Sequence, residues 1–271
     1  MFTIRDTEKS KLESDTTMNN VNSISWPELN EKYLDALKDG VEWIIDKFNP
    51  VGVIAAGTII RGNPDMSSDF DMFVIHNAGF RQRIQKIFKN IPFEIFVNPP
   101  CSIIKNLQDE YKSQRQCTAH MLSTGYVLIN KESIVSELIA SASKYLNMKP
   151  DFDEFQATML RYKAAVFLED ALDIKNKDTG MANIFISDSV QALLGWYYYK
   201  EQVFMPRQKE LIAATERLYP EIGGYARKIM ESCQVDDKIT YLRRLADLTI
   251  KTYGFFEWES KPEEVKTETA G

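Results

Sequence analysis

The stretch from residue 57 to residue 71 decides the fold and reads Gly57-Thr-Ile-Ile-Arg-Gly-Asn-Pro-Asp-Met-Ser-Ser-Asp-Phe-Asp71. A short apolar run over residues 51–56 precedes it, and a second run over 71–75 begins at its last residue. A third run over 93–97 is closed by Asn98-Pro-Pro100. Runs of this length bounded by Gly, Pro and Asn favour strands over helices. We therefore predict three strands, the first two joined by the quoted stretch.

Helical patterns lie before and between these strands. We predict one helix over about 26–48, capped by Ser25 or Ser23, and another over about 80–89 that links the second and third strands. Strands that alternate with helices in this way indicate an α/β unit.

After Pro150 the chain contains long helical patterns and few strand signals. One apolar stripe predicts a helix over about 151–176, capped by Asp151 or Asp153. Its members are Leu160, Ala164, Phe167, Ala171 and Ile174. We expect further helices over about 182–202, 207–219, 223–233 and 236–258, which together predict an antiparallel helical bundle.

The chain length of 271 residues is near the size at which a second domain usually appears. We predict a disordered polar arm over 1–24, an α/β domain over 25–149, a helical domain over 150–258 and a flexible tail over 259–271. The boundary is expected near 148–151, where strand signals give way to helical ones.

The composition is that of an ordinary globular protein, with 44% apolar and 27% charged residues and a net charge of −6. Nucleic-acid partners usually require a basic excess, so the charge argues against them. Three widely spaced cysteines predict neither a disulfide framework nor a structural zinc site. Neither a secretory signal nor a membrane-spanning apolar run is evident in the sequence. We expect a soluble cytoplasmic protein.

Residues at the start of the quoted stretch are suited to phosphate binding. Gly57 lacks a side chain and permits a close approach to the backbone. Thr58 is expected to open a short helix, offering a hydroxyl and free N–H groups at its positive end. Arg61 lies in the same turn and can donate charge-assisted hydrogen bonds to phosphate oxygens.

Acidic residues at the end of the stretch are suited to metal binding. Asp69 and Asp71 flank Phe70, and in an extended chain alternate side chains share one face of the sheet. Two carboxylates held this close are costly unless a cation lies between them. Glu94, inside an apolar strand, would complete the group if its strand lies beside theirs. Mg²⁺ prefers such oxygen ligands together with substrate phosphates.

These residues at this spacing resemble the signature of the polymerase-β-type nucleotidyltransferase superfamily. Gly57-Thr58 correspond to its Gly-Ser pair, Asp69 and Asp71 to its metal-binding pair, and Glu94 to its third carboxylate. Arg61-Gly62 and Ser68 also occur at matching offsets. The family implies an α+β fold with a mixed, strongly twisted sheet.

The layout of a small domain followed by helices resembles the antibiotic nucleotidyltransferases of the kanamycin and lincosamide type. The resemblance implies transfer of a nucleoside monophosphate, most simply AMP from ATP, onto a hydroxyl of a small acceptor, with one or two Mg²⁺ ions and release of pyrophosphate. The negative charge is compatible with a cationic acceptor, and the kanamycin type suggests a homodimer.

Asp69, Asp71 and Glu94 would then be the catalytic and metal-binding residues. The nucleotide-binding residues would be Gly57, Thr58, Arg61 and Ser68. In the antibiotic type an acidic residue of the helical domain can accept the proton of the acceptor hydroxyl, and the candidates for that base are Glu169, Asp170 and Asp173.

Two other functions remain open at the level of sequence. The acceptor can be a protein or an RNA end, as in toxin-neutralising transferases, although the helical half lacks the histidine that an accompanying nuclease would need, since none follows His120. The chain can also be a non-catalytic nucleotide-binding module. Solvent exposure is the simpler explanation of Arg161, Lys163 and Lys209, and a structural role is the simpler explanation of His76 and His120.

Overall fold

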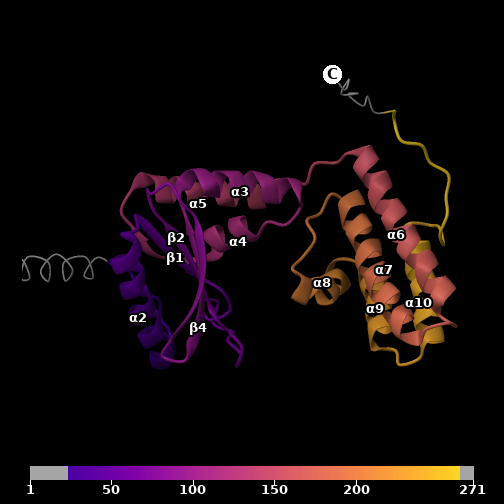
Figure 1. The fold of residues 1–271 in the computed structure, drawn as a ribbon, viewed down its shortest axis with the longest axis horizontal. Coiled ribbons are helices and arrows are strands. Elements are labelled where there is room, and N and C mark those ends of the chain that lie inside the picture. Colours follow the sequence, from indigo (N-terminus) through magenta and orange to yellow (C-terminus); the bar gives the residue numbers. More distant parts are fainter. Residues whose placement is uncertain (1–23, 263–271) are drawn as a thin grey trace, which may run out of the picture. The chain divides into compact units, whose positions relative to one another are not determined.

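The computed structural model describes residues 24–262, and these form two compact units that divide between Met148 and Lys149. The first unit is an α+β structure and the second is all helical (Figure 1). Among residues 24–262 no helix is long and apolar enough to span a membrane.

The first unit is built on a five-stranded mixed sheet in the order β3-β4-β2-β1-β5. The parallel pair is β2 with β4, and all other neighbours are antiparallel. The strands are β1 (Gly52–Ala56), β2 (Phe70–Ile75), β3 (Gln82–Phe88), β4 (Ile91–Asn98) and β5 (Tyr126–Asn130). A mixed sheet with helices is the fold class predicted above.

Helices cover both faces of the sheet (Figure 1). Helix α2 (Glu31–Phe48) packs on one face, where Gly40 lies so close to the sheet that an added Cβ would be 2.6 Å from the ring of Phe93. Three helices cover the other face and contribute Ile103, Leu122 and Val135 to its core. They are α3 (Pro100–Lys112), α4 (Cys117–Thr124) and α5 (Ser133–Leu146).

Alternate residues of β2 divide between these two cores, as expected for a strand buried on both faces. Phe70 and Met72 belong to the core beneath α2, whereas Phe73 and Ile75 belong to the core beneath α3, α4 and α5. Asp71 therefore points to the side of α3–α5, at the end of the strand where its side chain is only half buried.

The first helix begins five residues later than the sequence analysis predicted. Its N-cap is Asn30, whose Oδ1 accepts the N–H of Lys32 at 3.1 Å. Ser25 is not the cap, because its N–H donates to the carbonyl of Leu128 at 3.1 Å and so ties this segment to β5. Ser23, the other predicted cap, lies outside the described residues.

The predicted helix over 80–89 is wrong, because the structure has β3 there. Lys89 and Asn90 both adopt positive φ, 46° and 64°, and make the tight turn that folds β3 back onto β4. A two-residue turn with both residues left-handed matches the twist of an antiparallel hairpin. Pairing with β4 therefore outweighs the helix-like spacing of Ile84, Ile87 and Phe88.

The second unit is a bundle of helices with one shared core. Helix α6 is capped by Asp153, whose Oδ1 accepts the N–H of Gln156, and it packs along α7. Inside the bundle the buried Tyr198 hydroxyl lies 3.1 Å from that of Thr215. The elements are α6 (Glu154–Ile174), α7 (Thr179–Lys200), η1 (Gln208–Glu210), α8 (Leu211–Leu218), α9 (Pro220–Glu231) and α10 (Val235–Leu248).

The last helix ends earlier than predicted, at Leu248 rather than near 258. Two residues beyond it adopt positive φ, Lys251 at 56° and Gly254 at 152°, and no helix can continue through them. The aromatic residues over 255–258 therefore lie on an irregular segment. Phe255 is 87% exposed, whereas Phe256 packs partly against the bundle core.

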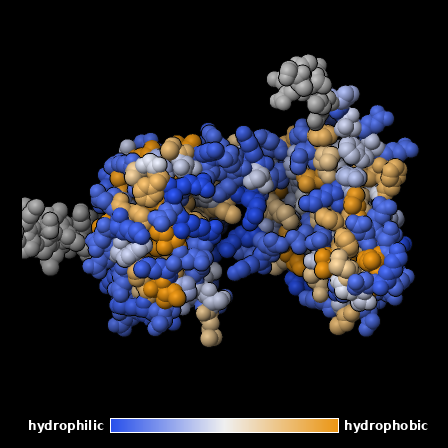
Figure 2. Space-filling model, viewed as in Figure 1, coloured by the Kyte–Doolittle hydropathy of each residue, from blue (hydrophilic) through white to orange (hydrophobic). Residues whose placement is uncertain are grey.

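Hydrophilic residues predominate on the face of the molecule drawn in Figure 2, with hydrophobic ones dispersed among them. Among the exposed hydrophobic side chains are Met66, in the loop before β2, and Ile87, on the edge strand β3, which is 69% exposed. Residues 1–23 of the predicted arm and 263–271 of the predicted tail lie outside the described part of the chain.

Candidate active site

Asp69 and Asp71 lie where β2 begins. Asp69 directly precedes the strand and Asp71 is its second residue, with the fully buried Phe70 between them. Both aspartates are half buried. Side chains alternate along a strand, so the two carboxylates lie on one face and the buried Phe70 packs on the other.

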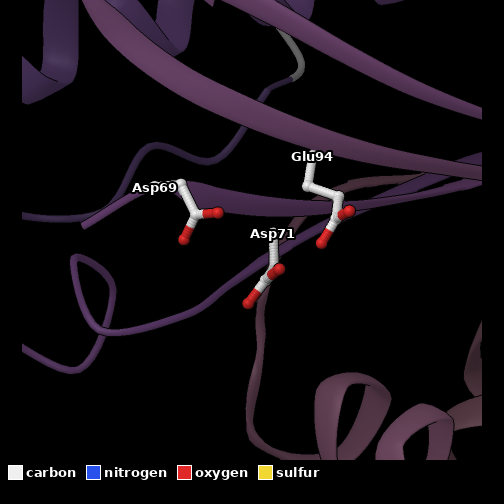
Figure 3. Close-up of side chains that lie close together, drawn as sticks. All are labelled: Asp69, Asp71 and Glu94. Atoms are coloured by element: carbon white, nitrogen blue, oxygen red, sulfur yellow. The ribbon is translucent and has the colours of Figure 1, made fainter. Parts of the chain in front are cut away.

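Glu94 lies beside them because β2 and β4 are parallel. In this pairing Asp71 is the direct partner of Glu94, and Phe70 is the partner of Phe93. Asp69, Asp71 and Glu94 each offer an oxygen, and these three oxygens lie within 4.8 Å of one another. All three side chains point to the same side of the strands (Figure 3). This group of residues is called the acidic triad below.

Gly57 lies against the triad at the end of β1. Its φ is +97°, a conformation that favours glycine, and an added Cβ would lie 3.1 Å from the carbonyl oxygen of Asp69 and 3.3 Å from Oδ2 of Asp71. Ala56, the residue before it, pairs with Asp71 across the antiparallel ladder. Any side chain at Gly57 would fill the space beside the carboxylates.

The segment after Gly57 forms turns rather than the predicted short helix. The N–H of Arg61 donates to the carbonyl of Gly57 at 3.2 Å, and that of Asn63 donates to the carbonyl of Thr58 at 3.1 Å, after which the chain leaves the turn. The side chain of Arg61 is exposed. Backbone N–H groups at this place therefore come from a turn, not from a helix terminus.

Hydroxyl groups join the two ends of the loop before the triad. Thr58 Oγ1 donates to Ser68 Oγ at 2.9 Å, and Ser68 Oγ donates to Oδ1 of Asp65 at 3.0 Å. Asp65 Oδ1 also accepts the N–H of Ser67 at 2.9 Å. Both residues predicted to bind phosphate through a hydroxyl, Thr58 and Ser68, thus lie together beside Gly57 and Asp69.

Arg83 is the site residue that sequence reasoning missed. Its guanidinium donates from both Nε and an Nη to Oε1 of Glu94, with an Nε–Oε1 distance of 2.9 Å. Gln85 donates to the same oxygen at 3.4 Å. Both donors lie on β3, where the sequence pattern favours a helix, and a helix there would not place them beside Glu94. Asn90, which stands ahead of an apolar run, is the sequence signal for a hairpin, because asparagine favours the left-handed turn conformation that it adopts here with φ 64°.

His76 and His120 lie outside the triad. His76 is 1% exposed, and its Nε2–H donates to the carbonyl of Phe80 at 2.9 Å while Nδ1 accepts the N–H of Ala78 at 3.2 Å. These bonds fix the turn that leads from β2 to β3. The carbonyl of His120 accepts the hydroxyl of Thr124 at 2.8 Å within α4. Both histidines therefore have structural partners.

Candidate residues of the helical unit lie on α6 or in η1. Arg161 donates from Nε to the carbonyl of Ile250 at 3.0 Å, and its guanidinium lies over the ring of Phe256 at 4.5 Å. Glu169 is exposed and packs against the backbone at Gly254. Roles in catalysis for Glu169, Asp170 and Asp173 stay predictions, and the cations Lys163 and Lys209 are exposed.

Neither a protein-family model nor a curated protein sequence matches the chain. Among solved structures it is similar to a nucleotidyltransferase-like protein from Exiguobacterium sibiricum, with 10% identity and a TM-score of 0.45, over 82% of this chain and 77% of that one. So remote a likeness says nothing about the reaction or the substrate. Function is therefore argued from the residues of the site.

Proposed function

We propose that the first unit catalyses metal-dependent nucleotidyl transfer from ATP, or another nucleoside triphosphate, onto a hydroxyl group of a small acceptor. The acidic triad carries the proposal: Asp69, Asp71 and Glu94 present oxygens within 4.8 Å of one another at a half-buried end of the sheet. The resemblance of Gly57-Thr58 and Asp69–Asp71 to the polymerase-β-type signature supports it, and so does the space that Gly57 leaves beside the carboxylates.

The donor set fits Mg²⁺, because three carboxylates within this distance are hard oxygen ligands and cost free energy unless a cation shares them. Asp69, Asp71 and Glu94 would hold one or two ions. A bound Mg²⁺ would supply charge neutralisation for the triphosphate and lower the pKa of a hydroxyl close to it.

In the proposed reaction the acceptor oxygen forms a bond to the α-phosphorus, the bond from that phosphorus to the β-phosphate bridge breaks, and pyrophosphate leaves. Glu94 is the proposed base for the hydroxyl proton. Its Oε1 is held by Arg83 and Gln85, whereas Oε2 accepts no hydrogen bond from any residue between 24 and 262. One oxygen of this carboxylate, Oε1, is thus held in place, while Oε2 is left to accept the proton.

Thr58, Ser68 and Arg61 are proposed to bind the triphosphate. The turn after Gly57 brings the two hydroxyls within 2.9 Å of each other, and the exposed Arg61 guanidinium lies on the same turn. Hydroxyl and guanidinium donors are well suited to phosphate oxygens. The acceptor, a cytoplasmic location and a homodimer stay predictions from the sequence.

Labelled ATP tests the proposal directly. The full chain is incubated with Mg²⁺ and a panel of aminoglycosides, lincosamides, tRNA and candidate proteins, once with label on the α-phosphate and once with label on the γ-phosphate. Nucleotidyl transfer places the α-label on the acceptor and releases pyrophosphate. The mass of the labelled product separates a small acceptor from a macromolecular one.

Two variants control the assay. Asp71→Ala should abolish transfer and Mg²⁺-dependent ATP binding while the circular dichroism spectrum stays unchanged. Asp46→Asn removes a charge from an exposed position on α2, away from the triad, and should leave transfer intact. Transfer of the γ-label would refute nucleotidyl transfer in favour of phosphoryl transfer. Undiminished metal and ATP binding by Asp71→Ala would refute the assignment of the site.

A further inference from the structure

The guanidinium of Arg83 occupies one oxygen of the acidic triad. It donates to Oε1 of Glu94 from two nitrogens, so the two side chains form an ion pair across β3 and β4. The side chain of Glu94 is 17% exposed and that of Arg83 is 66% exposed. A cation thus already lies at Glu94, the member of the triad that comes from β4 rather than from the start of β2.

The position of Arg83 is set by the sheet. Its direct partner on β4 is Phe96, two residues from Glu94 on the same face, and the guanidinium lies 5.0 Å from the centroid of the Phe96 ring. A guanidinium above an aromatic face is attracted by the ring. From that place it reaches diagonally to Glu94, a distance that long side chains cover readily.

We propose that Arg83 is a positioning residue that acts as an intramolecular counter-ion of Glu94 and thereby lowers the affinity of the acidic triad for divalent cations. The inference rests on the proposed function, because it assigns a metal to that triad. In the protein without metal, Arg83 offsets one of three negative charges and holds Oε1. An incoming dication competes with the guanidinium for Glu94 and is repelled by its charge.

The exposure of Arg83 makes this competition reversible. With two thirds of its side chain in solvent, the guanidinium can leave Oε1 without unpacking any buried group, and the ring of Phe96 offers it a second contact. A buried arginine would instead lock the carboxylate. The arrangement keeps Glu94 oriented while the site is empty of metal and still permits metal to bind.

Titration calorimetry of the full chain with Mn²⁺ alone tests the inference, since it requires neither a nucleotide nor an acceptor. Arg83→Gln should bind Mn²⁺ about tenfold more tightly, the effect of removing one positive charge a few ångströms from a dication when water screens the pair. Arg83→Lys retains the charge and should restore an affinity close to that of the wild type. A merely structural role for Arg83 would weaken metal binding in the variants instead.

Arg81→Gln is the matched control. Arg81 is an exposed arginine just before β3, and among residues 24–262 it forms no ion pair. Its loss changes the net charge equally and should alter Mn²⁺ affinity less than twofold. Unchanged or weaker binding by Arg83→Gln overturns the inference, and so does equal tightening by Arg81→Gln.

The same titration separates failure of the inference from failure of the proposed function. Binding by the wild type that is lost in Asp71→Ala, with Arg83→Gln like the wild type, overturns the role of Arg83 alone. Absence of Mn²⁺ binding by the wild type overturns the metal site and the inference with it. When labelled ATP reveals an acceptor, Arg83→Gln should lower kcat more than it raises KM, because Glu94 loses its orientation.

Discussion

Replacing Asp69 by asparagine should stabilise the protein without metal and remove its stabilisation by metal. The side chain is half buried at the start of β2, and asparagine keeps its shape. The substitution removes one of three like charges whose oxygens lie within 4.8 Å of one another. It leaves the buried Phe70 beside it untouched.

The size of the effect follows from Coulomb's law. Two unit charges at this separation repel by about 0.9 kcal/mol when screened as in water, and by more in less polar surroundings. Asp69 faces two such charges, but Arg83 offsets that of Glu94 through its ion pair. We expect Asp69→Asn to raise the free energy of unfolding by about 1 kcal/mol in EDTA. With Mn²⁺ at about a hundred times its Kd, the wild type should gain about 2.7 kcal/mol and the variant none.

The order of stability of the two proteins should therefore reverse when EDTA is replaced by Mn²⁺. Thermal unfolding followed by tryptophan fluorescence measures both conditions, and hydrogen exchange locates the change in β2 and β4. Asp46→Asn, which removes an exposed charge on α2, should behave as the wild type in both. The reasoning would be refuted if Asp69→Asn were less stable than the wild type in EDTA, or if Mn²⁺ stabilised it as much as it stabilises the wild type.

Further predictions concern both units. Gly57→Ala should lower the free energy of unfolding by about 1–3 kcal/mol, because φ is positive there, and should weaken Mn²⁺ binding measured by calorimetry. Thr215 Oγ1 donates to the carbonyl of Leu211, so the Tyr198 hydroxyl donates to Thr215; Tyr198→Phe removes this buried donor and should cost about 1–3 kcal/mol in urea unfolding, and no loss would contradict the hydrogen bond. Burial raises the pKa of Glu110 above its ordinary value of 4.5 despite hydrogen bonds from Thr118. The native state then holds the proton more tightly, so stability should fall as pH rises from 4.5 through the raised pKa, and Glu110→Gln should flatten that part of the urea-unfolding profile.

Strands β1, β2 and β4 could be predicted from sequence because their signals are local. Each is an apolar run closed by glycine, proline or asparagine, and alternation alone places Asp69 and Asp71 on one face. Glu94 was predicted to join them if its strand lay beside theirs. The parallel register that pairs Asp71 with Glu94 depends on tertiary structure and is seen only in the structure.

Strand β3 is not predicted from its own residues, because their spacing is ambiguous between a helix and a strand. Ile84, Ile87 and Phe88 recur as on one side of a helix, yet in the strand Ile87 is 69% exposed and Ile84 faces the core beneath α2. An edge strand with one solvent face needs few apolar residues, so its pattern is weak. Arg83 was missed for the same reason, since its contact with Glu94 exists only when β3 is a strand.

The helices over 100–146 and strand β5 were not predicted either. Pro100, which was interpreted only as closing a strand, is the first residue of α3, a position where its missing N–H costs nothing. Helix α10 was predicted too long because residues 249–258 contain apolar and aromatic side chains, and the positive φ of Lys251 and Gly254 could not be anticipated from them.

Because Asp71 pairs directly with Glu94, the register of the sheet sets the spacing of the triad. Because side chains alternate with a period of two, inserting one residue between Phe93 and Glu94 would turn that carboxylate from the face beneath α3, α4 and α5 into the core beneath α2. Residues 62–67 are exposed and lie outside the sheet, so insertions ahead of Asp65 leave the register of β2 with β4 unchanged. The loop can therefore change length without moving Asp71 relative to Glu94, as long as Asp65 keeps its hydrogen bonds with Ser67 and Ser68, whereas a change of length within β2 or β4 would separate the two carboxylates.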